Sequence, residues 1–308
     1  MLIGVAAYFG YKSIPALDST HSFANEAVSI IQPILIFSML FLTFCKVKFS
    51  DLHFARWHWW LLALQTISFS LCALIVINSE LGHWALVIES FMLCMICPTA
   101  TAAAVVTMKL KGNPATLTTY TILINLATAL LVPALVPLMH PSAEHNFINS
   151  FLIIISKVFP LLFCPFLLAM ILRRINSHIT EWFARYKDLA FYLWAVALTL
   201  AIAVTCKTID HSHCPVIYMA GIALASAVAC VIQFAIGRYL GRKYGEPISA
   251  AQSAGQKNTV FAIWMGYTFM SPLSSLAGGF YSIWHNIYNS WQLYQVQKSR
   301  TSPTENQN

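Results

Sequence analysis

Charged side chains are scarce in this sequence, and acidic ones are the scarcest. Only 9% of the 308 residues are charged and 11 are Asp or Glu, whereas 58% are apolar. A soluble domain needs more polar surface than this composition supplies, so a soluble globular protein is excluded and an integral membrane protein is indicated. No polar stretch is long enough to form a separate soluble domain. We therefore predict one membrane domain over residues 1–308, ending in a cytoplasmic tail at 297–308.

A basic leader is missing as well. The N-terminal apolar run, "MLIGVAAYFGYKSIP", has no Lys or Arg before it. Signal peptides carry a positively charged region ahead of their apolar segment, so we expect a short or clipped first span here instead.

Clusters of reactive side chains are absent too. The eight cysteines are scattered through apolar segments. Cys94 and Cys97 form a C-x-x-C, but they lie one turn apart in an apolar run, and we expect small apolar residues rather than a redox pair. No stretch has the spacing of a known metal site or of a catalytic motif, so we predict no metal, no cofactor and no enzymatic activity.

What the sequence does hold is a series of long apolar runs. A helix needs about 20 apolar residues to cross the roughly 30 Å hydrocarbon layer. The runs predict an all-α polytopic membrane protein with ten spans. The spans cover residues 2–17, 27–45, 59–78, 84–108, 115–139, 147–172, 188–206, 215–237, 247–270 and 272–295.

Basic side chains are distributed unevenly between the predicted loops. The loops after spans two, four, six and eight hold most of them, whereas the alternate loops hold Lys12 and Lys207. Lys and Arg resist translocation, so the richer loops and both termini are predicted to be cytoplasmic. The expected location is a bacterial cytoplasmic membrane, which the loop charges do not themselves indicate. The +7 net charge then reflects topology and contact with anionic lipid, and it gives no support to nucleic-acid binding. The basic residues of the richer loops are Lys46, Lys48, Arg56, Lys109, Lys111, Arg173, Arg174, Arg185, Lys187, Arg238, Arg242 and Lys243.

Two spans are interrupted by residues that disfavour a continuous helix. Span four contains "CPTATAAAVVT" with Pro98, and span nine contains "SAGQKNT" with Gly255 followed by four polar side chains. Each is the fourth span of a five-span half, and an odd number of spans inverts the second half relative to the first. The pattern predicts an inverted repeat, residues 1–140 and 147–296, with crossed broken helices at its centre. The alternative is that each half simply contains one kinked helix.

These interruptions resemble motifs of the bile acid:sodium symporter family. "CPTATAAAVVTMKLKGN" is similar to the family's C-P-G-G-T-A-S-N-V-x-T followed by K-G-N, and "SAGQKNT" is similar to E-V-G-x-Q-N-S. "PLSSLAGGFYSIWHN" and "IIQPILIFSMLFLTFCKVKFSDL" also resemble its last and second helices. The resemblance implies sodium-driven transport of an organic anion, with spans 1, 2, 6 and 7 forming a panel and spans 3, 4, 5, 8, 9 and 10 forming a core.

The resemblance also implies the residues of the site. Substrate-binding positions are Thr101, Asn258, His285 and Asn286. Ion-site or ion-replacing positions are Lys257, Gln65, Gln256, Ser253, Thr99, Thr128 and Asn125.

Several positions depart from the family pattern where sodium needs oxygen ligands. The Ser-Asn pair of the fourth helix is Ala103 and Ala104, and a threonine of the fifth helix is Ala129. In span nine the acidic residue is Ser253, and the coordinating glutamine is Lys257. The first sodium site therefore looks dismantled.

The two changes in span nine, Ser253 and Lys257, are related by their net charge. In the family a glutamate and two sodium ions leave the loaded centre at +1, and a protonated Lys257 beside Ser253 gives the same charge. Lys257 lies ten residues after Pro247, or about 15 Å along a helix, which places it near the midplane. An unpaired lysine there costs at least about 2.5 kcal/mol, so a functional reason is expected. We hypothesise that Lys257 replaces sodium, either as a permanent counter-charge or as a protonation switch, and donates to Gln65 and to free carbonyls.

The sequence also allows other roles for Lys257. Lys257 could instead pair with a carboxylate such as Glu89 or extend outward to the interface, and Lys157 is expected at a surface or cavity rim. A +1 centre suits a carboxylate, so the predicted partners are a small or bile-acid-like organic anion and the lipid bilayer, with sodium or a proton as coupling ion. Other interpretations of the function are a sodium-coupled symporter with one degenerate site, a non-transporting sensor, and an intramembrane enzyme that uses Ser253, Lys257 and His285.

Overall fold

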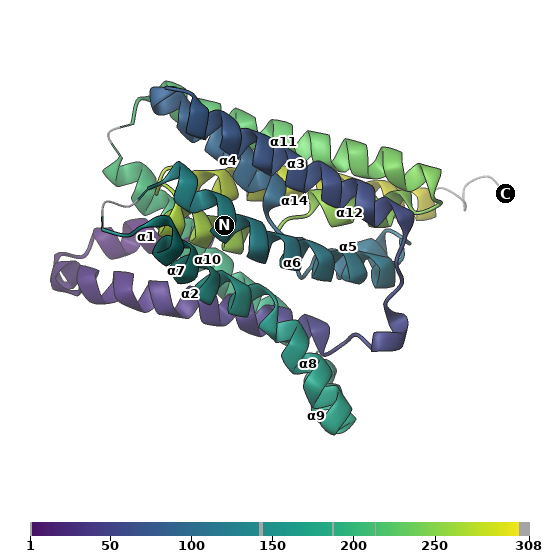
Figure 1. Ribbon diagram of the computed structural model, residues 1–308. Coiled ribbons are helices and arrows are strands. Elements are labelled where there is room, and N and C mark those ends of the chain that lie inside the picture. The colour runs from purple at the N-terminus through teal and green to yellow at the C-terminus, as the bar shows by residue number, and fades with distance from the viewer. Residues whose placement is uncertain (1, 142–143, 187, 213, 302–308) are drawn as a thin grey trace.

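A computed structural model describes residues 2–141, 144–186, 188–212 and 214–301, and within these ranges the chain is helical with no strand. The helices run roughly alongside one another in an elongated bundle (Figure 1). The first part of the chain forms α1 (Leu2–Lys12), η1 (Pro15–Thr20), α2 (His21–Phe44), η2 (Phe49–Asp51), α3 (Arg56–Asn78), η3 (Gly82–Trp84), α4 (Ala85–Ile96), α5 (Ala103–Lys109) and α6 (Pro114–Met139). The second part forms α7 (Phe147–Leu162), α8 (Cys164–Ile175), α9 (Ser177–Arg185), α10 (Leu189–His211), α11 (Val216–Lys243), α12 (Pro247–Gly255), α13 (Thr259–Phe269) and α14 (Leu276–Thr301).

Five of the described helices are long and apolar enough to cross a membrane: α2, α3, α6, α10 and α11. A sixth candidate is α7 with α8, which are bent by 45°. These helices confirm the prediction of an all-helical integral membrane protein. They are fewer than the ten predicted spans because α1 has 11 residues and because predicted spans four and nine are each divided into two short helices. Predicted span ten corresponds to α14, which is 26 residues long but is not among the described helices apolar enough to cross.

The predicted basic loops gather at one end of the bundle. The α2–α3 and α5–α6 connections, helix α9 and the C-terminal end of α14 lie on the right in Figure 1, opposite the α3–α4 and α10–α11 connections. At this basic end Arg173 Nη2 donates to the carbonyl of Cys45 at 2.6 Å, which ties α8 to the end of α2. Lys187, one of the counted basic residues, lies outside the described residues.

Two stretches of helix were not expected from the sequence. Helix α9 is a nine-residue amphipathic helix at the basic end, too short to give a spanning signal, and its Phe183 packs edge-on against Phe41 with ring centroids 5.1 Å apart. Helix α14 continues to Thr301, so residues 297–301 of the predicted tail are helical. Residues 302–308 lie outside the described part of the chain.

Glycines bring the short helix α12 close against α11. A Cβ atom at Gly237 would lie 2.7 Å from the carbonyl oxygen of Ala250, and one at Gly241 would lie 2.5 Å from the carbonyl oxygen of Glu246. Only a residue without a side chain fits at such distances. The packing fixes the start of α12, and therefore the position at which it breaks, relative to the long helix α11.

Candidate functional site at the junction of two broken helices

The two predicted interruptions are present and lie against each other. Between α4 and α5 the chain is non-helical around Pro98, and between α12 and α13 it is non-helical around Lys257. Thr99 and Lys257 form an isolated antiparallel bridge. The amide of Asn258 donates to the carbonyl of Pro98, and the amide of Ala100 donates to the carbonyl of Gln256, both at 2.8 Å. Two segments some 160 residues apart in sequence thus hydrogen-bond through their backbones, and four helix ends meet there.

The break in span four frees carbonyl groups at the end of α4, and side chains from three other segments bind them. Pro98 has no N–H, so the carbonyl of Cys94 loses its helical donor, and the carbonyls of Met95 and Ile96 lose theirs because the chain leaves the helix. The three replacement donors come from α11, from the second break and from α6. They are Gln233 Nε2 to Cys94 at 3.2 Å, Lys257 Nζ to Met95 at 3.2 Å and Thr128 Oγ1 to Ile96 at 2.8 Å.

The break in span nine has the same arrangement at the end of α12. Here too three carbonyls without helical donors accept side-chain hydrogen bonds, from the first break, from α3 and from α14. They are Thr99 Oγ1 to Ser253 at 2.7 Å, Gln65 Nε2 to Ala254 at 3.4 Å and Tyr281 OH to Gly255 at 2.8 Å. Each broken helix is therefore capped by a glutamine, by a side chain of the opposite break and by a hydroxyl of a third segment.

The two glutamines join the two capping sets. Gln65 Nε2 donates to Gln233 Oε1 at 2.8 Å, and Tyr120 OH donates to Gln65 Oε1 at 2.6 Å. Gln233 Nε2 also donates to the hydroxyl of Tyr281 at 3.1 Å. Gln65 was predicted from the sequence, but Gln233 was not, although an isolated Gln within the apolar run of span eight is the signal that would have found it.

Lys257 is buried at the junction, with 2% of its surface exposed. Its ammonium group has three donors, and the carbonyl of Met95 accepts one of them. The hypothesis that Lys257 donates to a free carbonyl agrees with this contact. The described hydrogen bonds include none from Lys257 to Gln65, whose Oε1 instead accepts from Tyr120 OH at 2.6 Å. Among the described side chains, no carboxylate forms an ion pair with Lys257.

Glu89, the carboxylate considered as an alternative partner for Lys257, is occupied elsewhere. Ser274 donates to its Oε2 at 2.6 Å, and Nε2 of His140 lies 3.3 Å from its Oε1. The burial of Lys257 also excludes an ammonium that extends outward to the interface. Lys157, by contrast, is exposed and stands over the ring of Phe269, 5.8 Å from its centroid, as expected for a lysine at a surface or rim.

The four predicted substrate-binding residues fall into two groups. Thr101 and Asn258 lie at the junction, where Asn258 caps α13 by accepting from the amide of Phe261 at 3.2 Å. His285 and Asn286 lie on α14, where His285 packs against Tyr281 and the Asn286 amide donates to Ser282 of the same helix. Among the described contacts, none joins the second group to the first.

Several residues predicted for the ion site, and Asn258 and His285 predicted for substrate binding, carry buried polar atoms with no hydrogen-bond partner among the described residues. Such atoms are costly in a folded protein, and each one calls for an explanation such as water or a ligand. In the described part of the chain they include Ser253 Oγ, Gln256 Oε1, Asn258 Nδ2 and both amide atoms of Asn125. His285 Nδ1 is also buried and has no hydrogen-bond partner among the described residues. Thr99 and Thr128 differ, because their hydroxyls are used to cap the broken helices.

A second polar cluster, not anticipated from the sequence, surrounds Glu246 at the basic end. Its carboxylate accepts from Thr116 Oγ1 at 2.6 Å, from Trp57 Nε1 at 3.0 Å and from Asn113 Nδ2 at 3.3 Å. These donors come from α3, from the N-cap of α6 and from its first turn, so the carboxylate joins three helices. A cavity of about 560 Å³ lies beside the cluster, between the residues before α6 and those before α12.

Comparison with known proteins identifies a family. The model of the SBF-like CPA transporter family matches residues 3–295, nearly the whole chain. No curated protein matches the sequence.

Proposed function

The chain belongs to the SBF-like CPA transporter family, and we propose that it carries an organic anion across a membrane by alternating access, with Lys257 in the place of a sodium ion. The observation on which this rests is the buried ammonium of Lys257 at the junction of two broken helices, bound to a helix-end carbonyl and to no carboxylate among the described residues. Free carbonyls of broken helices are the groups with which transporters bind their coupling cations.

The capping pattern supports the inverted repeat that we propose for the ten spans. The donors at the end of α4 lie on spans eight, nine and five, and the donors at the end of α12 lie on spans three, four and ten. Exchanging the two halves pairs span three with eight, four with nine and five with ten, and it converts one set into the other. An inverted repeat produces such an exchange, whereas two unrelated kinked helices have no reason to share it.

The charge at the junction favours a carboxylate substrate. An ammonium with two donors unused attracts an anion, and the unpartnered amide nitrogen of Asn258 is a neutral donor beside it. Substrate would lie between the core, to which both broken helices belong in the proposed arrangement, and the panel of spans 1, 2, 6 and 7. We propose a small or bile-acid-like organic acid, without coupling to sodium.

Purified protein in proteoliposomes tests the proposal. A thermal-shift screen of organic acids, run at several pH values with and without sodium, first identifies a binding acid, because ligands of the native state raise its stability. Uptake of that acid is then measured at fixed pH with and without a sodium gradient. The expected result is uptake that does not depend on sodium. A steep dependence on sodium contradicts the replacement of sodium by Lys257, and binding without uptake indicates a sensor.

A double variant tests the ion-replacement argument from the opposite direction. Ser253→Glu with Lys257→Gln restores, at both positions, the residue types of the bile acid:sodium symporter motif. Uptake by the double variant is expected to rise with sodium, whereas Lys257→Gln alone is expected to be inactive under both conditions. Equal uptake by the double variant with and without sodium would show that these two positions do not hold the ion.

A further inference from the structure

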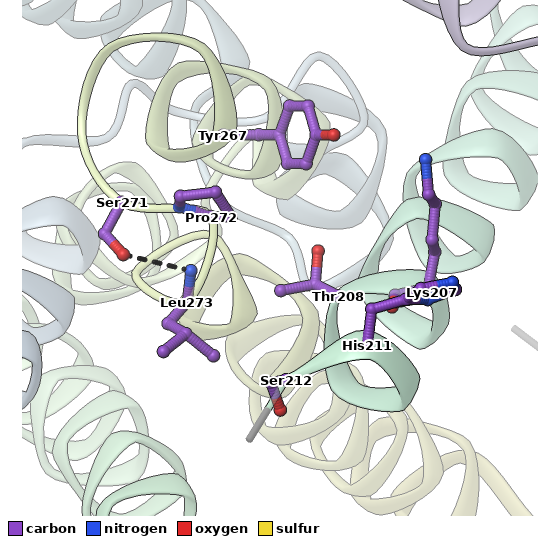
Figure 2. A pocket seen from close by; sticks show the side chains of 8 residues that line it. All are labelled: Lys207, Thr208, His211, Ser212, Tyr267, Ser271, Pro272 and Leu273. Carbon is purple, nitrogen blue, oxygen red and sulfur yellow. Dashed lines mark hydrogen bonds between the residues drawn. The ribbon is translucent and has the colours of Figure 1, made fainter. Parts of the chain in front are cut away.

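A cavity of about 330 Å³ lies at the end of the bundle opposite the basic loops, where the end of α10 faces the end of α13 and the loop that leads to α14 (Figure 2). This volume is at the lower end of those that hold small ligands. Residues i, i+1 and i+4 of a helix share one face, so one face of α10 together with its C-cap residue Ser212 supplies half of the lining. The polar residues that line the cavity are Lys207, Thr208, His211, Ser212, Tyr267 and Ser271.

Thr208 gives the cavity a donor that the protein itself does not use. Its side chain is buried, with 8% of its surface exposed, and its hydroxyl has no hydrogen-bond partner among the described residues. Figure 2 shows this hydroxyl directed into the space between Tyr267 and Lys207. Thr205, one turn earlier, is also buried, but its hydroxyl donates to the carbonyl of Ala201 at 3.0 Å. An unsatisfied hydroxyl at a cavity wall indicates a partner from outside the chain.

The charge of the cavity lining is positive. Lys207 uses one of its three donors on Asn25 Oδ1 at 2.6 Å and keeps two. His211 Nδ1 donates to the backbone carbonyl of Lys207 at 3.0 Å, which fixes the imidazole against α10. None of the described residues that line the cavity is acidic. The cavity therefore offers cationic and neutral donors together.

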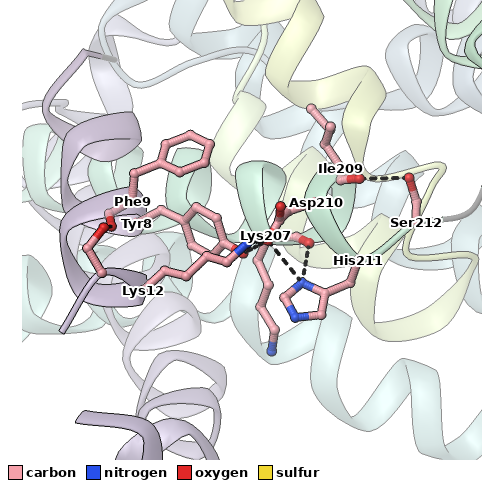
Figure 3. Close-up of polar contacts among 9 residues, drawn as sticks. Tyr8, Phe9, Lys12, Lys207, Ile209, Asp210, His211 and Ser212 are labelled. Atoms are coloured by element: carbon pink, nitrogen blue, oxygen red, sulfur yellow. Dashed lines mark hydrogen bonds and ion pairs between the residues drawn. The ribbon is translucent and has the colours of Figure 1, made fainter. Parts of the chain in front are cut away.

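Asp210, the nearest carboxylate on α10, is bound on another side of the helix. Lys12 Nζ and Tyr8 OH of α1 each lie 2.6 Å from its Oδ2, and the carboxylate points toward α1 (Figure 3). The nearer nitrogen of His211 is 3.8 Å away. Lys12 balances the charge of Asp210, so the charge of Lys207 is not cancelled locally.

We propose that this cavity is a second anion site, which binds the carboxylate of a small organic acid through Lys207 and the hydroxyl of Thr208. Lys257 is not part of its lining. In the ten-span arrangement of the proposed function α10 belongs to the panel and α13 and α14 belong to the core, so this site spans the boundary between panel and core. An anion bound in this cavity would lie at the end of the bundle opposite the basic loops, on its way to the junction of the two broken helices.

Benzoate serves as the probe, and binding is measured by calorimetry on the purified full-length protein. The measurement is made in the Lys257→Gln background, which disables the central site and separates this proposal from the proposed function. Benzoate is expected to bind this variant, and Lys207→Gln with Thr208→Val is expected to weaken the binding about tenfold or more. Gln at position 207 can still donate to Asn25, so that contact is preserved.

Thr208→Val alone distinguishes a binding role from a structural one. The change removes an unpartnered hydroxyl and keeps the shape of the side chain, so the melting temperature without benzoate is expected to stay the same or rise. Benzoate binding is expected to weaken roughly threefold to tenfold. Thr205→Val is the matched control, because it removes a hydroxyl that is bonded within α10 and should leave benzoate binding unchanged.

Labelling locates the site. Ser271→Cys is treated with a negatively charged thiosulfonate reagent, and benzoate is expected to slow its reaction. The proposal is overturned if the Lys257→Gln variant does not bind benzoate at millimolar concentration. It is also overturned if the triple variant, which adds Lys207→Gln and Thr208→Val, binds benzoate as well as Lys257→Gln does.

Discussion

Two charged side chains, Glu246 and Lys257, flank the short helix α12, and their surroundings are opposite. Glu246 stands just before α12 and accepts hydrogen bonds from three side chains of α3 and of the start of α6. Lys257 stands just after α12, is nearly completely buried, and donates to one backbone carbonyl. The carboxylate of Glu246, which accepts three hydrogen bonds, holds helices together. The ammonium of Lys257 keeps two donors that no described residue accepts, so it contributes less to holding the helices.

The difference separates a structural charge from a functional one. Removing a charge from water is expensive, and at Glu246, which is partly buried, three side-chain hydrogen bonds offset much of that cost. At Lys257 a single described hydrogen bond offsets little of that cost. Buried polar atoms of Ser253, Gln256 and Asn258, close to Lys257 in the chain, also have no partner among the described residues. Substitutions at Glu246 should therefore affect stability first, and substitutions at Lys257 should affect transport first.

Lys257→Met gives the largest expected effect. Uptake of a binding organic acid should fall by about a hundredfold or more, because the cation at the junction is lost. The free energy of unfolding should nevertheless rise by about 1 to 3 kcal/mol, since an under-satisfied buried charge is replaced by an apolar side chain of similar size. Uptake in proteoliposomes and thermal unfolding in detergent measure the two effects.

Lys157→Met is the matched control, because Lys157 is also a lysine of a predicted span but is exposed. It should change uptake and stability little. If Lys257→Met destabilises the protein, the ammonium is a structural group and the comparison with Glu246 fails.

Glu246→Ala is expected to have the next largest effect, this time on stability. It leaves Trp57, Thr116 and Asn113 without their shared acceptor and should lower the free energy of unfolding by about 2 to 4 kcal/mol. Glu246→Gln keeps the shape and one acceptor, so its loss should be smaller. Thermal unfolding measures both, and uptake per folded molecule should stay within about twofold of the parent. A large loss of uptake in stable Glu246→Gln would assign the carboxylate a transport role.

The sequence was sufficient to predict the class of fold and the two breaks. Pro98 lacks an N–H, and Gly255 precedes a run of polar side chains, and these local features suffice to interrupt a helix wherever it packs. Contact between the breaks could be inferred only by treating the two halves as a repeat. The sequence did not reveal α9, because nine amphipathic residues give no spanning signal.

The hydrogen-bond partners were the part that the sequence could not supply. Gln233 binds a carbonyl 139 residues away, and Ser274 binds Glu89 across 185 residues, so no local pattern connects them. Glu246 was not singled out from the sequence. Its role depends on three donors brought together by the packing of α3, α6 and α12.

A pair of buried amides tests the same comparison with neutral groups. Gln65 is bonded to Gln233, Ala254 and Tyr120, whereas both amide atoms of Asn125 lack partners. Gln65→Leu should cost about 2 to 3 kcal/mol in stability because it leaves the buried groups around it unpaired. Asn125→Leu should change stability by less than about 1 kcal/mol and should act on uptake instead. Thermal unfolding in detergent decides, and equal losses in the two variants would contradict the distinction.

The smallest expected effects concern the hydroxyls that cap the broken helices. Thr99→Val removes the donor to the Ser253 carbonyl and should lower the free energy of unfolding by about 1 kcal/mol, since the two backbone hydrogen bonds between the breaks remain. Thr128→Val should cost less, about 0.5 kcal/mol, because its hydroxyl is shared between the carbonyls of Ile96 and Ile124. Thermal unfolding of the two variants side by side measures the difference. A larger loss for Thr128→Val than for Thr99→Val would contradict the expectation that a shared hydroxyl contributes less than an unshared one.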